Sequence, residues 1–372
     1  MHPPVDGRCY PVRPTAMQTA PLTFALAMPI GPSDSGYPLL EQALVSIAAQ
    51  SISVRLAVLD ASGDPGVAAL LGRFAQLISH RRTGPDDGQA AAIQEGWDAL
   101  SGDVYGWLNA DDLLYPGALA AAAARFGQLP GADVVTGQSL FFSLRGEDMI
   151  YRGLHPEARP PDGALSRTNT ISQPSTFVRA GALQAVHGLD TTRHYTMDWD
   201  LWLRLQDKGA QFVFDKAPYS AVFMESGTKT AEFGHRRRQE ISALVASRAG
   251  HLAAWKSLFA FWLTHKAEAE ALPGRGMFTW LRETLQQGRT GSVGPPASDP
   301  AVWPLIHYGS GPASGLRVET DGPVTLALPT ISDEITVKGK TEIACNVASG
   351  SIFPVSVRAS PGARLKSIAL VG

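Results

Sequence analysis

The first 160 residues alternate apolar, strand-like runs with segments of helical periodicity, and this alternation limits the possible fold more than any other feature. "LTFALAMPI" (22–30) is an almost continuous apolar run that ends in turn residues, which is typical of a strand covered on both faces. Helical spacing follows in "YPLLEQALVSIAAQ" (37–50), and "VRLAVLDASGDPG" (54–66) is a second strand that ends at Asp60. A β-α-β-α order predicts a mostly parallel sheet with helices on both faces.

Helix-like and strand-like segments continue as far as residue 144. "VAALLGRFAQLI" (67–78) and "GQAAAIQEGWDAL" (88–100) have helical spacing, and "DVYGWLNADD" (103–112) is the next strand. A helix then opens at Pro116, a residue that suits a first helical position, and "ADVVTGQSLFFSL" (132–144) is a further strand. We therefore predict a Rossmann-like α/β domain.

The pattern changes after residue 150. A Pro/Gly-rich loop (153–164) leads to "HYTMDWDLWLRLQDKGAQFVF" (194–214), which predicts a helix that stops at Gly209 and a strand after it. Turn punctuation and alternation near the C-terminus predict a small β-rich appendage. The expected division is a flexible tail at 1–20, an α/β domain at 21–234, a helical extension at 235–290 and a β-rich module at 291–372.

Charge and cysteine content exclude several classes of protein. The 372 residues include 34 acidic and 32 basic side chains, so the net charge is −2. A nucleic-acid-binding protein usually has a strongly basic face or domain, and we expect no nucleic-acid partner here. The two cysteines, Cys9 and Cys345, lie near opposite ends of the chain, so neither a disulfide framework nor a cysteine metal site is expected.

No segment reaches the roughly 18 consecutive apolar residues of a membrane-spanning helix. "HLAAWKSLFAFWLTHKAEAEAL" (251–272) comes nearest, but Lys256 and His265 interrupt it. It predicts an amphipathic helix packed on the core, with a helix at a membrane surface as the alternative. Because the N-terminus lacks the charged-then-apolar order of a signal peptide, we expect a cytoplasmic protein, with peripheral contact at the inner face of the membrane as a second reading.

Polar residues gather where the strands end. Asn109 and Asp111 are two residues apart, so in a strand their side chains project to the same side. Oxygen ligands of this kind suit a hard cation that is partly held by a substrate's phosphates. Asp60 and Asp87 lie near the ends of neighbouring segments and would share that edge of a parallel sheet. The alternative for each acid is an ordinary role in capping a turn or a helix.

At this point the chain resembles glycosyltransferase family 2, whose catalytic domain has the GT-A fold. The resemblance covers roughly residues 21 to 232 and rests on the order and spacing of several motifs. They are the strand ending at Pro29, "LDASGD", "DDGQAAAIQEGW" and the three most specific, "GDVYGWLNADDLLYPGAL", "ISQPSTFVRAGALQAVHGLD" and "YTMDWDLWLRL". In such enzymes an Asp-x-Asp element helps to bind a nucleotide sugar and its divalent metal.

The resemblance implies roles for individual residues. Asp111 would be the metal ligand, with Asn109 as its partner toward ribose or metal, although the family more often has Asp at the position of Asn109. Lys229, in "ESGTKT" (225–230), would offset phosphate charge unless it is simply solvated. The implied donor-binding residues are Pro29, Asp60, Asp87, Gln89, Asn109 and Lys229, and the metal residues are Asp111 and Asn109.

"MDWD" (197–200) matches the position of the family's catalytic base. The resemblance implies that Asp198 is the base, with Asp200 as second choice. A helix start favours the ionised carboxylate that a base requires, but the same position also suits a capping residue. Trp199 and Trp202 are core residues or a sugar-stacking face, and we expect a structural role for nearby His194. "HRRRQE" (235–240) predicts a solvated helix face, with phosphate or anionic lipid contact as the alternative.

These expectations define a hexosyltransferase-type enzyme that depends on Mn²⁺ or Mg²⁺. It would invert the anomeric carbon while moving a sugar from a nucleotide diphosphate donor, UDP-linked by preference, to a hydroxyl of a glycan or lipid-linked acceptor in surface polysaccharide biosynthesis. A catalytically weak GT-A-like sugar- or nucleotide-binding module is the main alternative, and a nucleotidyltransferase is the third. No motif specifies the donor sugar, the acceptor, the linkage or the oligomeric state.

Overall fold

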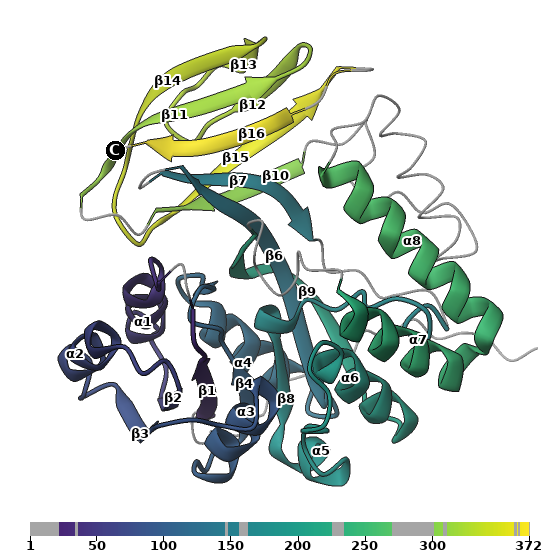
Figure 1. Ribbon diagram of the computed structural model, residues 1–372. Coiled ribbons are helices and arrows are strands. Elements are labelled where there is room, and N and C mark those ends of the chain that lie inside the picture. The colour runs from purple at the N-terminus through teal and green to yellow at the C-terminus, as the bar shows by residue number, and fades with distance from the viewer. Residues whose placement is uncertain are drawn as a thin grey trace, which may run out of the picture.

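The computed structural model shows an α/β domain joined to a stack of antiparallel strands (Figure 1). Four parallel strands form the N-terminal part of the main sheet in the order β3-β2-β1-β4. They are β1 (Phe24–Ile30), β2 (Val54–Asp60), β3 (Ile78–Thr83) and β4 (Val104–Trp107). The structure describes residues 22–33, 36–145, 148–155, 163–224, 234–269, 301–307, 311–360, 363 and 365–371.

Helices cover both faces of these strands, as the sequence predicts. In β1, Phe24, Leu26 and Met28 face one hydrophobic cluster, whereas Ala27 faces another, because side chains alternate along a strand. The first cluster receives α1 (Leu40–Ala48), α2 (Pro65–Arg73) and α4 (Ala118–Gln128), and the second receives α3 (Gln89–Asp98). The predicted α/β class is therefore confirmed.

Beyond β4 the sheet becomes mixed. Strand β8 (Thr176–Arg179) is antiparallel to both β4 and β6 (Val134–Arg145), whereas β9 (Phe212–Phe223) runs parallel to β6. The two-residue β5 (Leu113–Leu114) pairs with β9 and places the turn after β4 beside it. Between β7 and β9 lie η1 (Gln173–Ser175), α5 (Ala180–Ala185) and α6 (Met197–Asp207).

Two further helices pack against α6. They are α7 (His235–Ala249) and α8 (His251–Ala269), and their buried side chains join the cluster that contains α3. The predicted helical extension at 235–290 is helical as far as residue 269, and the rest of that range lies outside the described residues. Among the helices that the structure describes, none is both long enough and apolar enough to cross a bilayer.

The C-terminal residues form the β-rich appendage that the sequence predicts. One set, β11 (Ala313–Thr320), β14 (Lys340–Val347) and β16 (Leu365–Val371), extends the main sheet because β16 pairs with β7 (Asp148–His155). The other set is a separate antiparallel sheet in the order β10-β15-β12-β13. Its strands are β10 (Ala301–Ile306), β12 (Val324–Ala327), β13 (Ile335–Val337) and β15 (Ile352–Ala359).

Two buried tyrosines connect the α/β domain to β10. The Tyr115 hydroxyl donates to the carbonyl of Pro304, and the Tyr151 hydroxyl donates to the carbonyl of Ile306. The amide of Ile306 in turn donates to the Tyr151 hydroxyl at 2.8 Å. Residues of both parts also share one hydrophobic cluster. We therefore propose that residues 301–371 form a structural unit with the α/β domain instead of folding independently.

Tyr151→Phe tests that proposal. The substitution leaves both backbone groups of Ile306 without their buried partner, so we expect the free energy of unfolding to fall by about 1–3 kcal/mol. Tyr105→Phe is the matched control, because its hydroxyl donates to Leu100 O at 3.2 Å from a less buried position. Urea unfolding of both variants measures the difference. Equal stability of Tyr151→Phe and the wild type would contradict the proposed attachment.

Candidate active site

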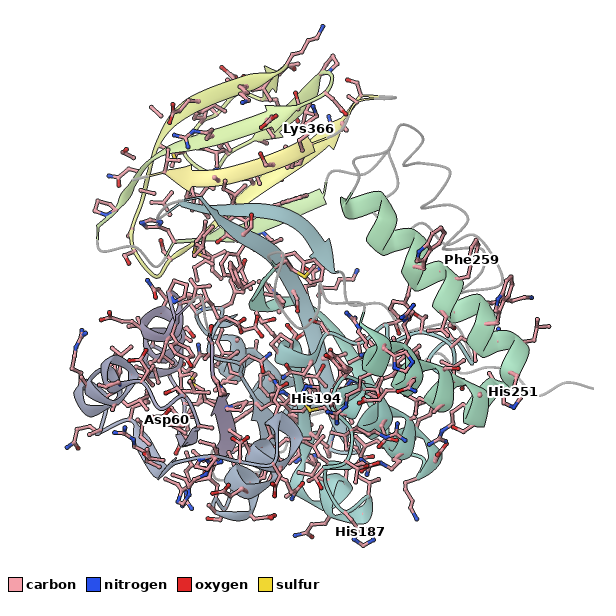
Figure 2. The ribbon with its side chains drawn as sticks, viewed as in Figure 1. Asp60, His187, His194, His251, Phe259 and Lys366 are labelled. Atoms are coloured by element: carbon pink, nitrogen blue, oxygen red, sulfur yellow. The ribbon has the colours of Figure 1, made fainter. Side chains whose placement is uncertain are left out.

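The candidate site lies at the carboxyl edge of the parallel strands, where open α/β sheets bind ligands. Pro29 is buried in β1 opposite Leu59, and Asp60 is the last residue of β2 (Figure 2). Asp60 is only 2% exposed; its Oδ1 accepts hydrogen bonds from the amide and hydroxyl of Ser62, and Oδ2 lies 3.7 Å from Arg81. The predicted donor-binding Asp60 is therefore at the expected edge and also shapes the following turn.

The loop before α3 holds a second predicted group. Gln89 is the first residue of α3, and its Nε2 donates to Asn109 Oδ1 at 2.8 Å. The acid that shapes this loop is Asp86, whose Oδ1 accepts from the Gly88 amide at 3.0 Å. Asp87 is exposed. The structure thus joins Gln89 to Asn109, and it places Asp87 at the surface of the same loop.

The turn after β4 contains two acids, Asp111 and Asp112, whose surroundings differ. Asp112 is 3% exposed, and its oxygens accept from Asn109 Nδ2 at 2.9 Å and from the Phe223 amide at 3.1 Å. Asp111 is half-buried. Burial raises the pKa of Asp111, and burial together with the Asp111 charge raises the pKa of Asp112 well above its usual range. A cation beside this pair would relieve both effects.

Asp111 fits a divalent metal better than Asn109 does. The Asn109 amide oxygen accepts from Gln89, so Asn109 would have to share or release that bond to become a ligand. Mg²⁺ is commonly held by one or two carboxylates together with substrate phosphates, and Asp111 could supply such a carboxylate. Within the described ranges, no group of three or more His, Cys, Asp or Glu side chains is arranged to hold an ion.

A short segment that sequence reasoning did not assign contacts both parts of the site. Asn169 Oδ1 accepts from the Ile171 amide at 3.2 Å, so its Nδ2 is free to donate to Asp198 Oδ2, 2.8 Å away. Gln173 Nε2 donates to Trp107 O at 2.7 Å, and its Oε1 lies 3.5 Å from Asn109 Nδ2. Gln173 lies inside the family-like motif that begins at Ile171, whereas Asn169 lies two residues before it, so the motif pointed to Gln173 but not to Asn169.

Asp198 is the second residue of α6. The helix is preceded by Thr196 at the N-cap position, and that side chain makes no capping hydrogen bond. Asp198 is therefore not the N-cap that sequence reasoning allowed as an alternative. Burial raises the pKa of its carboxyl, and this is opposed by hydrogen bonds from the Trp199 amide and Asn169 and by the charge of Arg237.

Asp200, the second choice for the base, is engaged in ion pairs. It is 5% exposed, and its two oxygens lie 3.2 Å from Arg193 Nε and 2.6 Å from Arg204 Nε. Arg204 Nη1 also donates to the carbonyls of Val186 and Gly188. This arrangement fastens α6 to the preceding loop and leaves Asp200 poorly placed to accept a substrate proton.

The aromatic residues of α6 belong to the core. Trp202 is fully buried and stacks on Trp107 with ring centroids 6.1 Å apart, and Trp199 Nε1 donates to Leu165 O at 2.6 Å. Neither forms a sugar-stacking face. The His194 amide donates to Glu240, which also accepts from the amides of Tyr195 and Thr196.

Glu240, the last residue of "HRRRQE", has a structural role, because it accepts hydrogen bonds from the backbone amides before α6. It also lies 3.4 Å from the guanidinium of Arg236. The ring of His194 (Figure 2) lies near the loop before α3. Its Nδ1 is 3.8 Å from the position that a Cβ atom on Gly88 would occupy. Lys229 and the "ESGTKT" segment lie outside the described residues.

Comparison with known proteins gives one family match and several solved structures of low similarity. Three of these structures are S. aureus TarS 1–349 in complex with UDP-GlcNAc, S. aureus TarS, and the mannosyltransferase PcManGT from Pyrobaculum calidifontis in complex with GDP-Man and Mn²⁺. In that order the identities are 14%, 11% and 17%, and the TM-scores are 0.45, 0.45 and 0.46. They cover 71%, 90% and 70% of this chain, and 78%, 72% and 79% of their own.

No curated protein matches the chain. Residues 107–264 match the family described as "Glycosyl transferase family group 2". That segment contains Asn109, Asp111, Asn169 and Asp198 and runs from the end of β4 into α8. The resemblance to glycosyltransferase family 2 that the sequence motifs indicate is therefore confirmed, and it rests on residues 107–264.

Proposed function

We propose that the chain is a nucleotide-sugar glycosyltransferase that inverts the anomeric carbon. One observation carries the proposal: the segment from Asn169 to Gln173 contacts both the strand-end group at Asn109 and the carboxylate of Asp198. A donor site and a base must be held in fixed relation for a direct displacement, because reaction rates fall steeply when reacting groups are misplaced. The family match over residues 107–264 supports the same assignment.

Asp198 is the proposed general base. Its carboxylate would accept the proton of an acceptor hydroxyl while that oxygen forms a bond to the anomeric carbon and the bond to the diphosphate breaks. The pair of electrons from the broken bond leaves with the diphosphate. Asn169 donates to Asp198 Oδ2 and so fixes the direction in which the other oxygen points. A positioned carboxylate in this role is worth roughly 10² to 10⁴ in rate.

The donor would occupy the edge formed by Pro29, Asp60, Gln89 and Asn109. Asp60, at the end of β2, could accept a hydrogen bond from a base or ribose, and Asp87 and Lys229 remain proposed donor contacts. We propose Asp111 as the ligand of a Mn²⁺ or Mg²⁺ ion, with Asn109 beside it. Such an ion, when bound, stabilises the negative charge of a diphosphate.

The finer assignments extend this proposal. They are a UDP-sugar donor, transfer of a hexose, a glycan or lipid-linked acceptor in surface polysaccharide assembly, and a cytoplasmic location. Incubation with a panel of nucleotide sugars and Mn²⁺ tests the core of the proposal. Nucleotide release that depends on one sugar supports a transferase, whereas donor affinity with no turnover under any acceptor would identify a binding module.

The pH dependence provides a separate prediction. Because burial raises the pKa of Asp198, the rate should fall with decreasing pH already above the usual aspartate value of about 3.9. Asn169→Ala removes a hydrogen bond to the charged form, so this acidic limb should move upward by about one pH unit. The Gln211→Ala variant is the control, because its exposed side-chain amide donates to the carbonyl of Gly209 instead of to Asp198. An unshifted limb in Asn169→Ala would contradict the assignment of Asp198.

A further inference from the structure

Helix α8 exposes several large apolar residues that an ordinary surface helix would bury. Its buried positions are small: Ala254, Ser257 and Ala260. Half-buried Leu258 and Phe261 also pack against the core. Leu252, Trp255 and Trp262 instead point outward and are exposed by 68%, 61% and 42%. A helix at a protein surface normally buries its large apolar stripe and exposes polar residues. The outer face of α8 therefore leaves a large apolar area in water.

Aromatic rings make up most of this outer face. The rings of Trp255 and Phe259 lie 5.7 Å apart at an angle of 2°, and those of Phe259 and Trp262 lie 5.7 Å apart at 22°. They follow one another along the helix at spacings of four and three residues, so they share one side. Figure 2 shows Phe259 and His251 on α8 at the edge of the molecule. We refer to Leu252, Trp255, Phe259 and Trp262 as the aromatic face.

The polar residues around the aromatic face identify its partner. Residues 251–262 include Lys256 and His251, both exposed, and no Asp, Glu, Asn or Gln. A glycan needs acids or amides beside the rings to accept and donate hydrogen bonds to its hydroxyls, and this segment supplies none. Trp at the boundary between water and hydrocarbon, with Lys reaching to the headgroups, is the pattern of a helix that lies in a bilayer interface.

We propose that the aromatic face of α8 docks the protein onto an anionic lipid bilayer. The aromatic face would enter the boundary between headgroups and acyl chains, and Lys256 would contact lipid phosphates. In this arrangement the helix would lie in the plane of the interface. Large apolar patches on a protein surface mark contact sites of this kind.

The inner face of α8 places this surface next to the candidate site. The ring of Phe261 lies 6.4 Å from that of Trp199, which is the neighbour of Asp198. Ser257 Oγ donates to Arg167 O at 2.5 Å, two residues before Asn169. Docking through α8 would therefore hold the Asp198 side of the molecule close to the lipid headgroups, where an acceptor attached to a lipid would be found.

Vesicle binding tests the proposal without donor or turnover, so its outcome is separate from that of the proposed function. The full chain is sedimented with vesicles of phosphatidylcholine alone or mixed with phosphatidylglycerol. We expect binding to the mixed vesicles and a blue shift of tryptophan fluorescence. The double variant Trp255→Ser/Trp262→Ser should partition at least about tenfold less, since withdrawing one large apolar side chain from water contributes about that factor.

Two further variants make the test specific. Leu129→Ser removes an exposed apolar side chain at the end of α4 and should bind vesicles as the wild type does. Lys256→Glu should weaken binding to the mixed vesicles, because the acid would be repelled by phosphatidylglycerol. UDP affinity and melting temperature, measured on every variant, show whether the fold is intact.

Three outcomes would overturn the proposal. They are no binding of the wild-type protein to either vesicle, equal binding of the wild type and the double variant, and self-association of the wild type that the double variant abolishes in place of vesicle binding. The last result would show that a second copy of the chain covers the aromatic face.

Discussion

Asp198→Asn is expected to lower the rate of sugar transfer by roughly 10² to 10⁴ while donor affinity stays unchanged. The substitution removes the group that accepts the hydroxyl proton. Its amide oxygen can still accept from Asn169, so α6 should begin as it does now. We therefore expect a loss of stability of about 1 kcal/mol or less, the net value of an ordinary hydrogen bond. Nucleotide release and melting temperature are measured on the same protein.

Asp200→Asn is the matched control on the same helix. It breaks a buried ion pair with Arg193 and Arg204, so it should cost about 3 kcal/mol of stability, while the folded fraction still turns over. The two variants thus separate a chemical from a structural role. If Asp198→Asn transfers sugar normally and a folded Asp200→Asn does not, the base is Asp200. Normal turnover in both would show that neither is the base.

Asp111→Ala should lower the metal-dependent affinity for UDP by more than the roughly 10- to 100-fold that loss of a supporting residue alone costs. Its carboxylate is the group that fits a divalent ion. Burial raises the pKa of Asp111, so metal-dependent binding should weaken as the pH falls, because protons compete for the carboxylate. Calorimetry with UDP and Mn²⁺ measures this affinity at several pH values.

Asn109→Asp is the variant to compare with Asp111→Ala. It restores the commoner family residue and should preserve or strengthen binding of the ion, although a carboxylate beside Asp112 would add repulsion in the absence of metal. Asp333→Ala, which removes an exposed acid in the loop between β12 and β13, is the neutral control. Unchanged UDP affinity in Asp111→Ala would refute the metal assignment.

The sequence predicted those features that depend on neighbouring residues along the chain. The apolar run in β1 and the helical spacing of α1 and α3 predict the α/β order, because burial on one or both faces imposes a local period. Strand ends are equally local, so Asp60 and Asn109 could be placed at the sheet edge in advance. Alternation and turn residues predict the C-terminal strands, but they do not predict that β16 pairs with β7.

The contacts that complete the site depend on residues far apart in the sequence. Asn169 and Asp198 are 29 positions apart, and Asp112 and the Phe223 amide are 111 apart. A polar residue that will be buried needs a hydrogen-bond partner, but the periodicity of the sequence does not identify that partner. The fold decided that Asp200 pairs with arginines, that Asp198 is held by Asn169, and that Asp112 faces inward.

The sequence by itself thus determined the elements, their order and the edge where a ligand would bind, since each follows from local periodicity and turn chemistry. Only the tertiary structure decided the partner of each buried polar group and the direction in which α8 faces. Apolar residues occur all around that helix, so its sequence does not specify an inner side. Packing against α7 and Trp199 turned Ala254, Ala260 and Phe261 inward, and the rings of Trp255 and Trp262 were left outside.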